Sequence, residues 1–243
     1  MPKKYYQKKK IKTVKNGRRF VIGDVHGCYR TLKELVEQKI GLKKTDQLFL
    51  LGDYIDKGPE SKKTLNYIIK LIKKGYAVYP LRGNHEQTLL ETEQNDSKQI
   101  LIWLMRRTPN ILKEGRLRKK HRDFLNSLPY YYELDNFFLV HANFNYQIEK
   151  PFKDKIAMLW KRKFDRCEKI LKRKILIHGH QPVNIDDIIL SVKNKSNVIG
   201  LDNGVNYIKK HKIYDYTQMG NLCALNLDTF ELSIQHNCEI MSC

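Results

Sequence analysis

Residues 19–27 read Arg-Phe-Val-Ile-Gly-Asp-Val-His-Gly, an apolar run that stops at a glycine and an acidic residue. Two later passages follow the same plan: residues 47–53 end in Gly-Asp, and residues 76–84 end in Gly-Asn. Apolar residues recur at helical spacing after the first two runs, a rhythm typical of β-α-β units. Because open α/β sheets place their sites beyond the carboxyl ends of the strands, we expect an α/β protein with polar functional residues at that edge.

The rest of the chain adds further strands. Residues 130–134 and 137–141 are separated by an Asp-Asn pair and are expected to form a hairpin. The later apolar runs at 175–177, 197–199 and 222–225 indicate a second sheet.

The chain divides into an arm and one domain. Residues 1–17 are rich in lysine and lack apolar periodicity, so we expect a flexible basic N-terminal arm. Residues 18–243 are long enough for one domain with a large core. Within it, residues 87–128 are expected to form a helical, basic side lobe or lid. The apolar stripe of this lobe would consist of Ile100, Leu101, Leu104 and Met105.

Composition limits the cellular setting and the partners. Lys and Arg number 46 against 26 Asp and Glu, and the net charge of +20 favours weak binding of polyanions, although a solvated lysine-rich surface explains it equally well. The five scattered cysteines indicate neither a disulfide framework nor a zinc knuckle. No apolar run reaches the length of a signal peptide or a membrane span, so we expect a cytoplasmic protein.

Five short segments combine glycine with residues that bind metals: 23–27, 52–58, 83–86, 141–143 and 178–180. Each one follows an expected strand. Glycine lets the backbone turn tightly beside an ion, and carboxylate, amide and imidazole ligands suit borderline divalent metals. The pattern therefore predicts a metal site.

In this order, the five segments resemble the phosphoprotein phosphatase family of the calcineurin-like metallophosphoesterases, over about residues 18–228. The resemblance implies two mixed β-sheets flanked by helices, with a dinuclear site at the carboxyl ends of the strands. It also implies two divalent ions, manganese first and iron, zinc or magnesium as alternatives. Their ligands would be Asp24 and His26 on the first ion, Asp53 as the bridge, and Asn84, His141 and His180 on the second.

The same resemblance assigns the chemistry. A hydroxide that bridges the two ions would attack the phosphorus atom, His85 would protonate the leaving oxygen, and Asp56 would orient and charge that imidazole. Lys57 stands where the family has an arginine that clamps the phosphate, so the charge is kept but the planar fork is lost. Arg162, in a Trp-Lys-Arg segment, is the candidate for a second clamp.

Two other positions are open or structural by sequence. His178 alternates away from His180 on the same strand and is expected to pack or support the site. Arg82 fits a structural ion pair as well as a substrate contact.

Three classes of function are compatible with these motifs. The segments at 27–29, 179–182 and 201–204 look most like the bacterial and phage lambda-type serine/threonine protein phosphatases, so a phosphoprotein is the first substrate expected. The alternative is a nucleotide or RNA-end hydrolase resembling the symmetrical diadenosine tetraphosphatases, although residues 141–147 depart from their usual continuation. A non-catalytic binding module is the third, and the complete ligand set argues against it.

Overall fold

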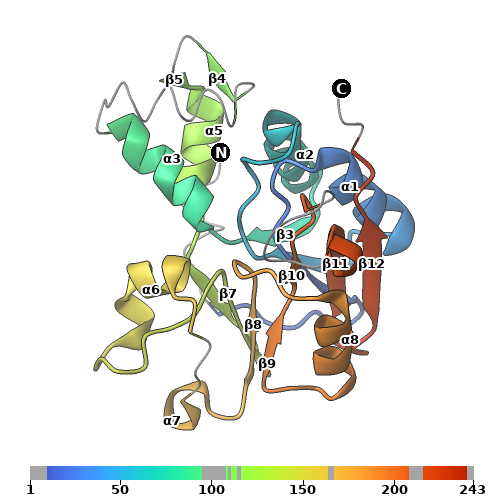
Figure 1. The fold of residues 1–243 in the computed structure, drawn as a ribbon, viewed down its shortest axis with the longest axis vertical. Coiled ribbons are helices and arrows are strands. Elements are labelled where there is room, and N and C mark those ends of the chain that lie inside the picture. Colours follow the sequence, from blue (N-terminus) through green and yellow to red (C-terminus); the bar gives the residue numbers. More distant parts are fainter. Residues whose placement is uncertain are drawn as a thin grey trace.

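The computed structural model describes residues 10–94, 108, 111–113, 116–163, 167–207 and 216–239. These residues form two mixed sheets that pack face to face, with helices on the outer sides (Figure 1). The α/β class and the two mixed sheets flanked by helices are therefore confirmed. None of the helices in these ranges is long and apolar enough to span a membrane.

The first sheet has the order β10-β11-β1-β2-β3, and β12 also pairs with β11. Strands β1, β2 and β3 are parallel, as the β-α-β rhythm predicts, whereas β11 is antiparallel to β1 and to β12. Its strands are β1 (Arg19–Ile22), β2 (Gln47–Leu50), β3 (Ala77–Pro80), β10 (Asp202–Asn203), β11 (Asn221–Asn226) and β12 (Leu232–His236).

The second sheet has the order β6-β7-β8-β9. The expected hairpin is present as antiparallel β6 (Tyr131–Glu133) and β7 (Phe137–Val140), and β8 (Ile175–His178) and β9 (Val198–Gly200) continue parallel to β7.

The assignment of the run at 222–225 to the second sheet is wrong, because this run lies in β11 of the first sheet. Ile22 pairs with Ala224 and Phe20 with Asn226. All four residues of β1 are buried, so this strand needs a hydrogen-bonding partner on each edge, and β11 supplies the second one.

Most helices cover the outer sides of the two sheets, whereas α8 contributes Ile188 and Val192 to the core between them (Figure 1). Helix α1 passes directly into a π-helical turn at Leu35–Lys39, and short 3₁₀ turns occur at Pro151–Lys153 and Tyr216–Gln218. The α-helices are α1 (Tyr29–Glu34), α2 (Ser61–Lys73), α3 (Asn84–Gln94), α5 (Lys119–Ser127), α6 (Lys155–Trp160), α7 (Glu168–Leu171) and α8 (Ile185–Lys193).

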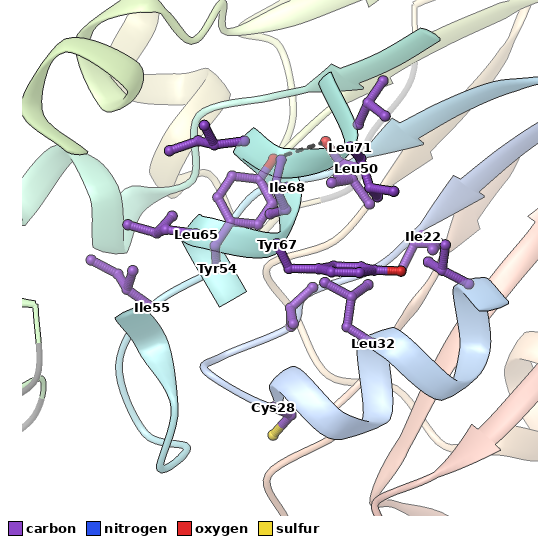
Figure 2. Close-up of a cluster of buried hydrophobic side chains, with 14 of the residues drawn as sticks. Ile22, Cys28, Leu32, Leu50, Tyr54, Ile55, Leu65, Tyr67, Ile68 and Leu71 are labelled. Carbon is purple, nitrogen blue, oxygen red and sulfur yellow. Dashed lines mark hydrogen bonds between the residues drawn. The ribbon is translucent and has the colours of Figure 1, made fainter. Parts of the chain in front are cut away.

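Alternation along the strands divides the core into three layers. In β1, Ile22 packs under α1 and α2, whereas its neighbour Val21 faces the second sheet. In β7, Leu139 faces the first sheet, and Phe138 faces outward into the cluster beneath α6 and α7. Figure 2 shows the layer under α1 and α2, where the side chain of Tyr54 lies among aliphatic residues.

The side lobe at 87–128 is only partly helical. Helices α3 and α5 lie beside each other, but a short antiparallel pair, β4 (Leu112–Lys113) and β5 (Arg116–Leu117), stands between them in sequence. Arg122 of α5 holds α3 through Glu93. The stripe expected at Ile100, Leu101, Leu104 and Met105 lies outside the described residues.

Residues 10–13 of the expected N-terminal arm lie along the edge of β6. The Ile11 amide donates to the Glu133 carbonyl at 3.0 Å, and the Thr13 hydroxyl donates to Asp135 at 2.7 Å. Lys10 adds an ion pair with the Glu133 carboxylate at 3.4 Å. An edge strand offers unpaired backbone groups, and this segment satisfies some of them.

Candidate metal centre

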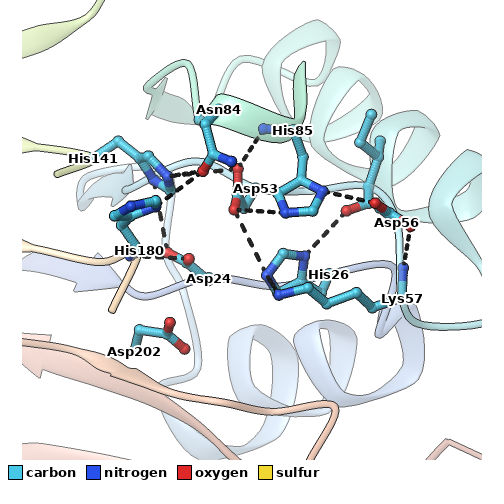
Figure 3. Close-up of polar contacts among 12 residues, drawn as sticks. Asp24, His26, Asp53, Asp56, Lys57, Asn84, His85, His141, His180 and Asp202 are labelled. Carbon is cyan, nitrogen blue, oxygen red and sulfur yellow. Dashed lines mark hydrogen bonds and ion pairs between the residues drawn. The ribbon is translucent and has the colours of Figure 1, made fainter. Parts of the chain in front are cut away.

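The six residues expected to bind metal come from the carboxyl ends of strands in both sheets, and they meet at one place (Figure 3). Those from the first sheet follow β1, β2 and β3, and those from the second follow β7 and β8. In chain order they are Asp24, His26, Asp53, Asn84, His141 and His180.

Asp53 lies at the centre of this cluster. One carboxylate oxygen, Oδ2, is 3.6 Å from Nε2 of His26 and 3.7 Å from Nε2 of His85. The other, Oδ1, is 3.6 Å from Nε2 of His141. Its two oxygens thus face different imidazole nitrogens, as the oxygens of a bridging carboxylate would.

Asn84 and Asp24 complete the side of the cluster nearest the second sheet. The amide oxygen of Asn84 lies 2.8 Å from Nε2 of His141 and 3.0 Å from Nδ1 of His180. Asp24 Oδ1 is 3.9 Å from His141 Nδ1, and Asp24 Oδ2 accepts the backbone N–H of His180 at 3.0 Å. Asp24, Asp53 and His141 form one compact candidate group, and His26, Asp53 and His85 form another.

Backbone carbonyls set the tautomers of two histidines. Nδ1 of His26 lies 3.2 Å from the Ile55 carbonyl, and Nδ1 of His141 lies 3.0 Å from the Leu51 carbonyl. A carbonyl only accepts, so each Nδ1 carries the proton and each Nε2 presents a lone pair to the cluster.

The ligand histidines are held neutral. Burial lowers the pKa of His26, with Lys57 adding to the effect, and burial likewise lowers the pKa of His141. Burial and then the nearby His141 lower the pKa of His180 to about 3. A neutral imidazole is the form that binds a metal, so these residues are competent ligands at neutral pH.

The carboxylates of Asp24 and Asp53 are buried close to each other. Burial, Asp202 and Asp53 together raise the pKa of Asp24. Burial also opposes ionisation of Asp53, but its electrostatic interactions with His141, His85, His26 and Lys57 outweigh burial and lower its pKa. Among the described side chains, Asp24 Oδ1 and His180 Nε2 are buried without a hydrogen-bond partner. Buried acceptor atoms without a hydrogen-bond partner, next to carboxylates that repel each other, are suited to bind divalent cations. The Asp, His and Asn side chains are ligands that borderline metals prefer.

His85 differs from the other histidines. Its Nδ1 lies 2.7 Å from Asp56 Oδ2, its backbone N–H donates to Asp53 Oδ1 at 3.0 Å, and its side chain is 17% exposed. Burial lowers its pKa, but the charge of Asp53 and the hydrogen bond that Nδ1 donates to Asp56 prevail and raise it above the ordinary value. The imidazole of His85 is therefore protonated more readily than that of an ordinary histidine.

Two cations flank the centre. The Lys57 ammonium donates to Nε2 of His26 at 2.9 Å and lies 5.8 Å from the centre of the Tyr207 ring. Arg162 is exposed, and its charge contributes to a lower pKa of both His180 and Asp202, so it lies within electrostatic reach of the site.

Backbone strain is concentrated at this site. Five non-glycine residues have positive φ, a conformation that costs about 1 kcal/mol or more and persists where the surroundings impose it. Gly83 allows a close approach, since a Cβ there would lie 2.1 Å from Asp53 Oδ1. The strained residues are His26 (45°), Asp53 (51°), Asp56 (73°), Lys57 (67°) and His180 (66°).

Two buried acids at the site were not singled out from the sequence. Glu86 accepts the backbone N–H groups of Asp53 and Tyr54, both at 2.8 Å, and of Gly83 at 2.9 Å, so it ties two ligand loops together. Asp202 accepts the Gly204 N–H at 2.8 Å, and burial raises its pKa to about 6. The sequence pattern could have identified both acids, because each one lies in a glycine-containing segment that follows a strand.

The structure also decides two open assignments. Arg82 donates to the carbonyls of Leu125 and Asn126 at 2.9 and 3.0 Å and to Gln87 at 2.7 Å, so it is a structural residue that holds α3 and α5 to the sheet. His178 is buried, and burial lowers its pKa to about 4. Its packing role is consistent with the alternation along β8.

The fold and the ligand set together define a metallophosphoesterase. Residues 17–216 match the family described as calcineurin-like phosphoesterase, and the chain belongs to this family. Members of the family use a pair of divalent metal ions, and the clustered residues fit that requirement.

Curated relatives include symmetrical bis(5'-nucleosyl)-tetraphosphatases. That of Erwinia tasmaniensis is 33% identical over 104 residues, which cover 36% of this chain and 37% of the relative. That of Proteus mirabilis is 41% identical over 71 residues, which cover 29% of this chain and 25% of the relative. The chain thus matches between a quarter and little more than a third of their length.

Solved structures resemble the chain over nearly all of its length. A putative diadenosine tetraphosphatase has a TM-score of 0.65 at 18% identity and covers 96% of this chain and 100% of its own. A protein serine/threonine phosphatase from Saccharomyces cerevisiae has a TM-score of 0.64 at 14% identity, with 97% and 84% covered. At such identities, the likeness concerns the fold alone.

Proposed function

We propose that this protein is a metal-dependent phosphomonoesterase that releases phosphate from phosphoserine and phosphothreonine in proteins. Two divalent ions, manganese first and iron, zinc or magnesium as alternatives, would activate water and bind the phosphoryl oxygens when present. The proposed ligands are Asp24, His26, Asp53, Asn84, His141 and His180, with Asp53 as the bridge.

The pairing of His85 with Asp56 at 2.7 Å carries this proposal. Serine and threonine leave as alkoxides, which are poor leaving groups, so hydrolysis of their phosphates requires a proton donor. The raised pKa of His85 favours the protonated imidazole, and Nε2 lies 3.7 Å from Asp53 Oδ2 at the cluster. We assign His85 as the general acid and Asp56 as the residue that orients and charges it.

The two flanking cations are the proposed phosphate clamps. Lys57 contacts His26 and Arg162 acts electrostatically on His180, and together the two cations would neutralise the dianionic ester. Lys57 offers a point charge rather than a bidentate fork, so its hold on the phosphate oxygens is less directional than that of an arginine.

The second candidate is a nucleotide hydrolase that splits dinucleoside tetraphosphates or acts on RNA ends. The names of the curated relatives favour it. Its leaving group would be a phosphate, which departs readily and has less need of a general acid. The net charge of +20 would also attract a polyphosphate chain.

A parallel assay separates the two candidates. Purified protein loaded with manganese is given a phosphoserine peptide and, separately, diadenosine tetraphosphate, while its metal content is measured. We expect phosphate release from the peptide and two metal ions per chain. Rapid cleavage of the dinucleotide without release from the peptide would reverse the order of the candidates.

The cellular setting is also a proposal. The described cysteines Cys28, Cys167, Cys223 and Cys238 are unpaired, which is consistent with a reducing compartment. We therefore place the enzyme in the cytoplasm.

A further inference from the structure

Helix α6 exposes apolar side chains although it is firmly packed. Ala157, Met158 and Leu159 are buried on its inner side, where Met158 joins the core cluster of the second sheet. On the outer side, Ile156 is 74% exposed and Trp160 is 45% exposed. These two residues are four positions apart, so they lie one above the other on the same face of the helix.

This exposed face adjoins the metal centre. The Trp160 ring lies 6.3 Å from the ring of His180 and nearly perpendicular to it, at 88°. His180 in turn contacts Asn84 at 3.0 Å within the cluster. The apolar face therefore begins beside a proposed metal ligand and extends one helical turn away from it along α6.

The surroundings of this face are basic. The exposed residues Lys153, Lys155, Arg162 and Lys163 are its neighbours in sequence. A substrate that combines negative charge with an apolar side chain is complementary to such a surface, and a phosphopeptide has both.

We propose that Ile156 and Trp160 form a docking surface for an apolar side chain that lies close in sequence to the phosphorylated residue of a peptide substrate. This inference rests on the proposed function, because the phosphate of the same peptide must enter the metal centre. An extended peptide advances about 3.3 Å per residue, so a residue within a few positions of the phosphoserine reaches α6.

The aliphatic half of the surface favours a peptide over a nucleobase. A nucleobase stacks on an aromatic ring, and of the two residues in this surface Trp160 has such a ring and Ile156 does not. A leucine or isoleucine side chain, by contrast, contacts both residues.

The test compares phosphoserine peptides with leucine or glycine at successive positions on either side of the phosphoserine. We expect kcat/KM to be at least about fivefold higher for leucine than for glycine at one or two of these positions. The reason is that burial of a leucine side chain stabilises the bound substrate by a free energy equivalent to about a fivefold change or more. Equal kcat/KM at every position would overturn the inference.

Two variants locate the preference on α6. Ile156→Ser and Trp160→Ala should each lower the leucine-to-glycine ratio toward one, and the ratio cancels any common effect on catalysis. The matched control is Ile189→Ser, because Ile189 on α8 is also exposed, at 42%, and should keep the ratio. A ratio unchanged in both α6 variants would refute the assignment of the surface.

The design separates this inference from the proposed function. If no peptide releases phosphate while diadenosine tetraphosphate is cleaved, the protein phosphatase assignment fails and the docking surface fails with it. If all peptides are hydrolysed at the same rate, only the docking surface fails.

Discussion

Replacement of His85 by asparagine tests the proposed general acid most directly. An asparagine keeps the backbone N–H that donates to Asp53 Oδ1 at 3.0 Å, and its amide can still donate to Asp56. What it lacks is a proton that can be transferred. His85→Asn should therefore retain the fold and the metal ligands while losing the acid.

The expected loss depends on the leaving group. General acid catalysis contributes about 100-fold to 10,000-fold, and the short contact of His85 with Asp56 holds the imidazole in position, so we expect a loss of about 100-fold or more on a phosphoserine peptide. Nitrophenolate leaves without protonation, so the loss on p-nitrophenyl phosphate should stay below about tenfold.

The assay measures kcat and kcat/KM on both substrates, with metal content and thermal unfolding as controls. An equal loss on both substrates would refute the reasoning, because protonation of the leaving group cannot explain it. If the bound metal is lost as well, His85 acts as a ligand together with His26 and Asp53.

Three further outcomes are expected. Asp56→Asn removes a group that raises the pKa of His85, so the alkaline fall of kcat/KM should move to lower pH by about one unit, and an unmoved profile would contradict the pairing. Lys57→Arg restores a bidentate fork and should raise kcat/KM on p-nitrophenyl phosphate a few-fold, whereas a variant no faster than the parent would argue against the clamp. Asp202 has a folded pKa of about 6 against an ordinary 3.8, so its contribution to stability is full below pH 3.8 and is lost as pH rises through 6. In chelator-treated protein, Asp202→Asn should consequently be more stable than the parent by about 3 kcal/mol near pH 7 and by nothing near pH 3, as measured by denaturant unfolding.

Much of the fold and most of the cluster could be predicted from the sequence. The runs that end in Gly-Asp and Gly-Asn correspond to β1, β2 and β3. Because parallel strands run in the same direction, their carboxyl ends lie at the same edge of the sheet. Local order along the chain was enough to predict that Asp24, Asp53 and Asn84 meet, and the likeness to a known family brought in His141 and His180.

Features that depend on contacts between distant segments escaped prediction. An apolar run such as 222–225 pairs equally well with either sheet by sequence, and the open edge of the buried strand β1 selected the first. Residues 10–13 look like a solvated arm until the exposed edge of β6 offers them backbone partners.

The chain by itself determined which side chains are available to bind metal, since ligand chemistry depends on residue type and on position after a strand. Only the tertiary structure decided their setting: the 2.7 Å contact of His85 with Asp56, the support of the ligand loops by Glu86, and the apolar face that α6 leaves exposed. The physical reason is that pKa values, exposure and hydrogen bonding depend on neighbours in space, and those neighbours come from segments far apart in the sequence.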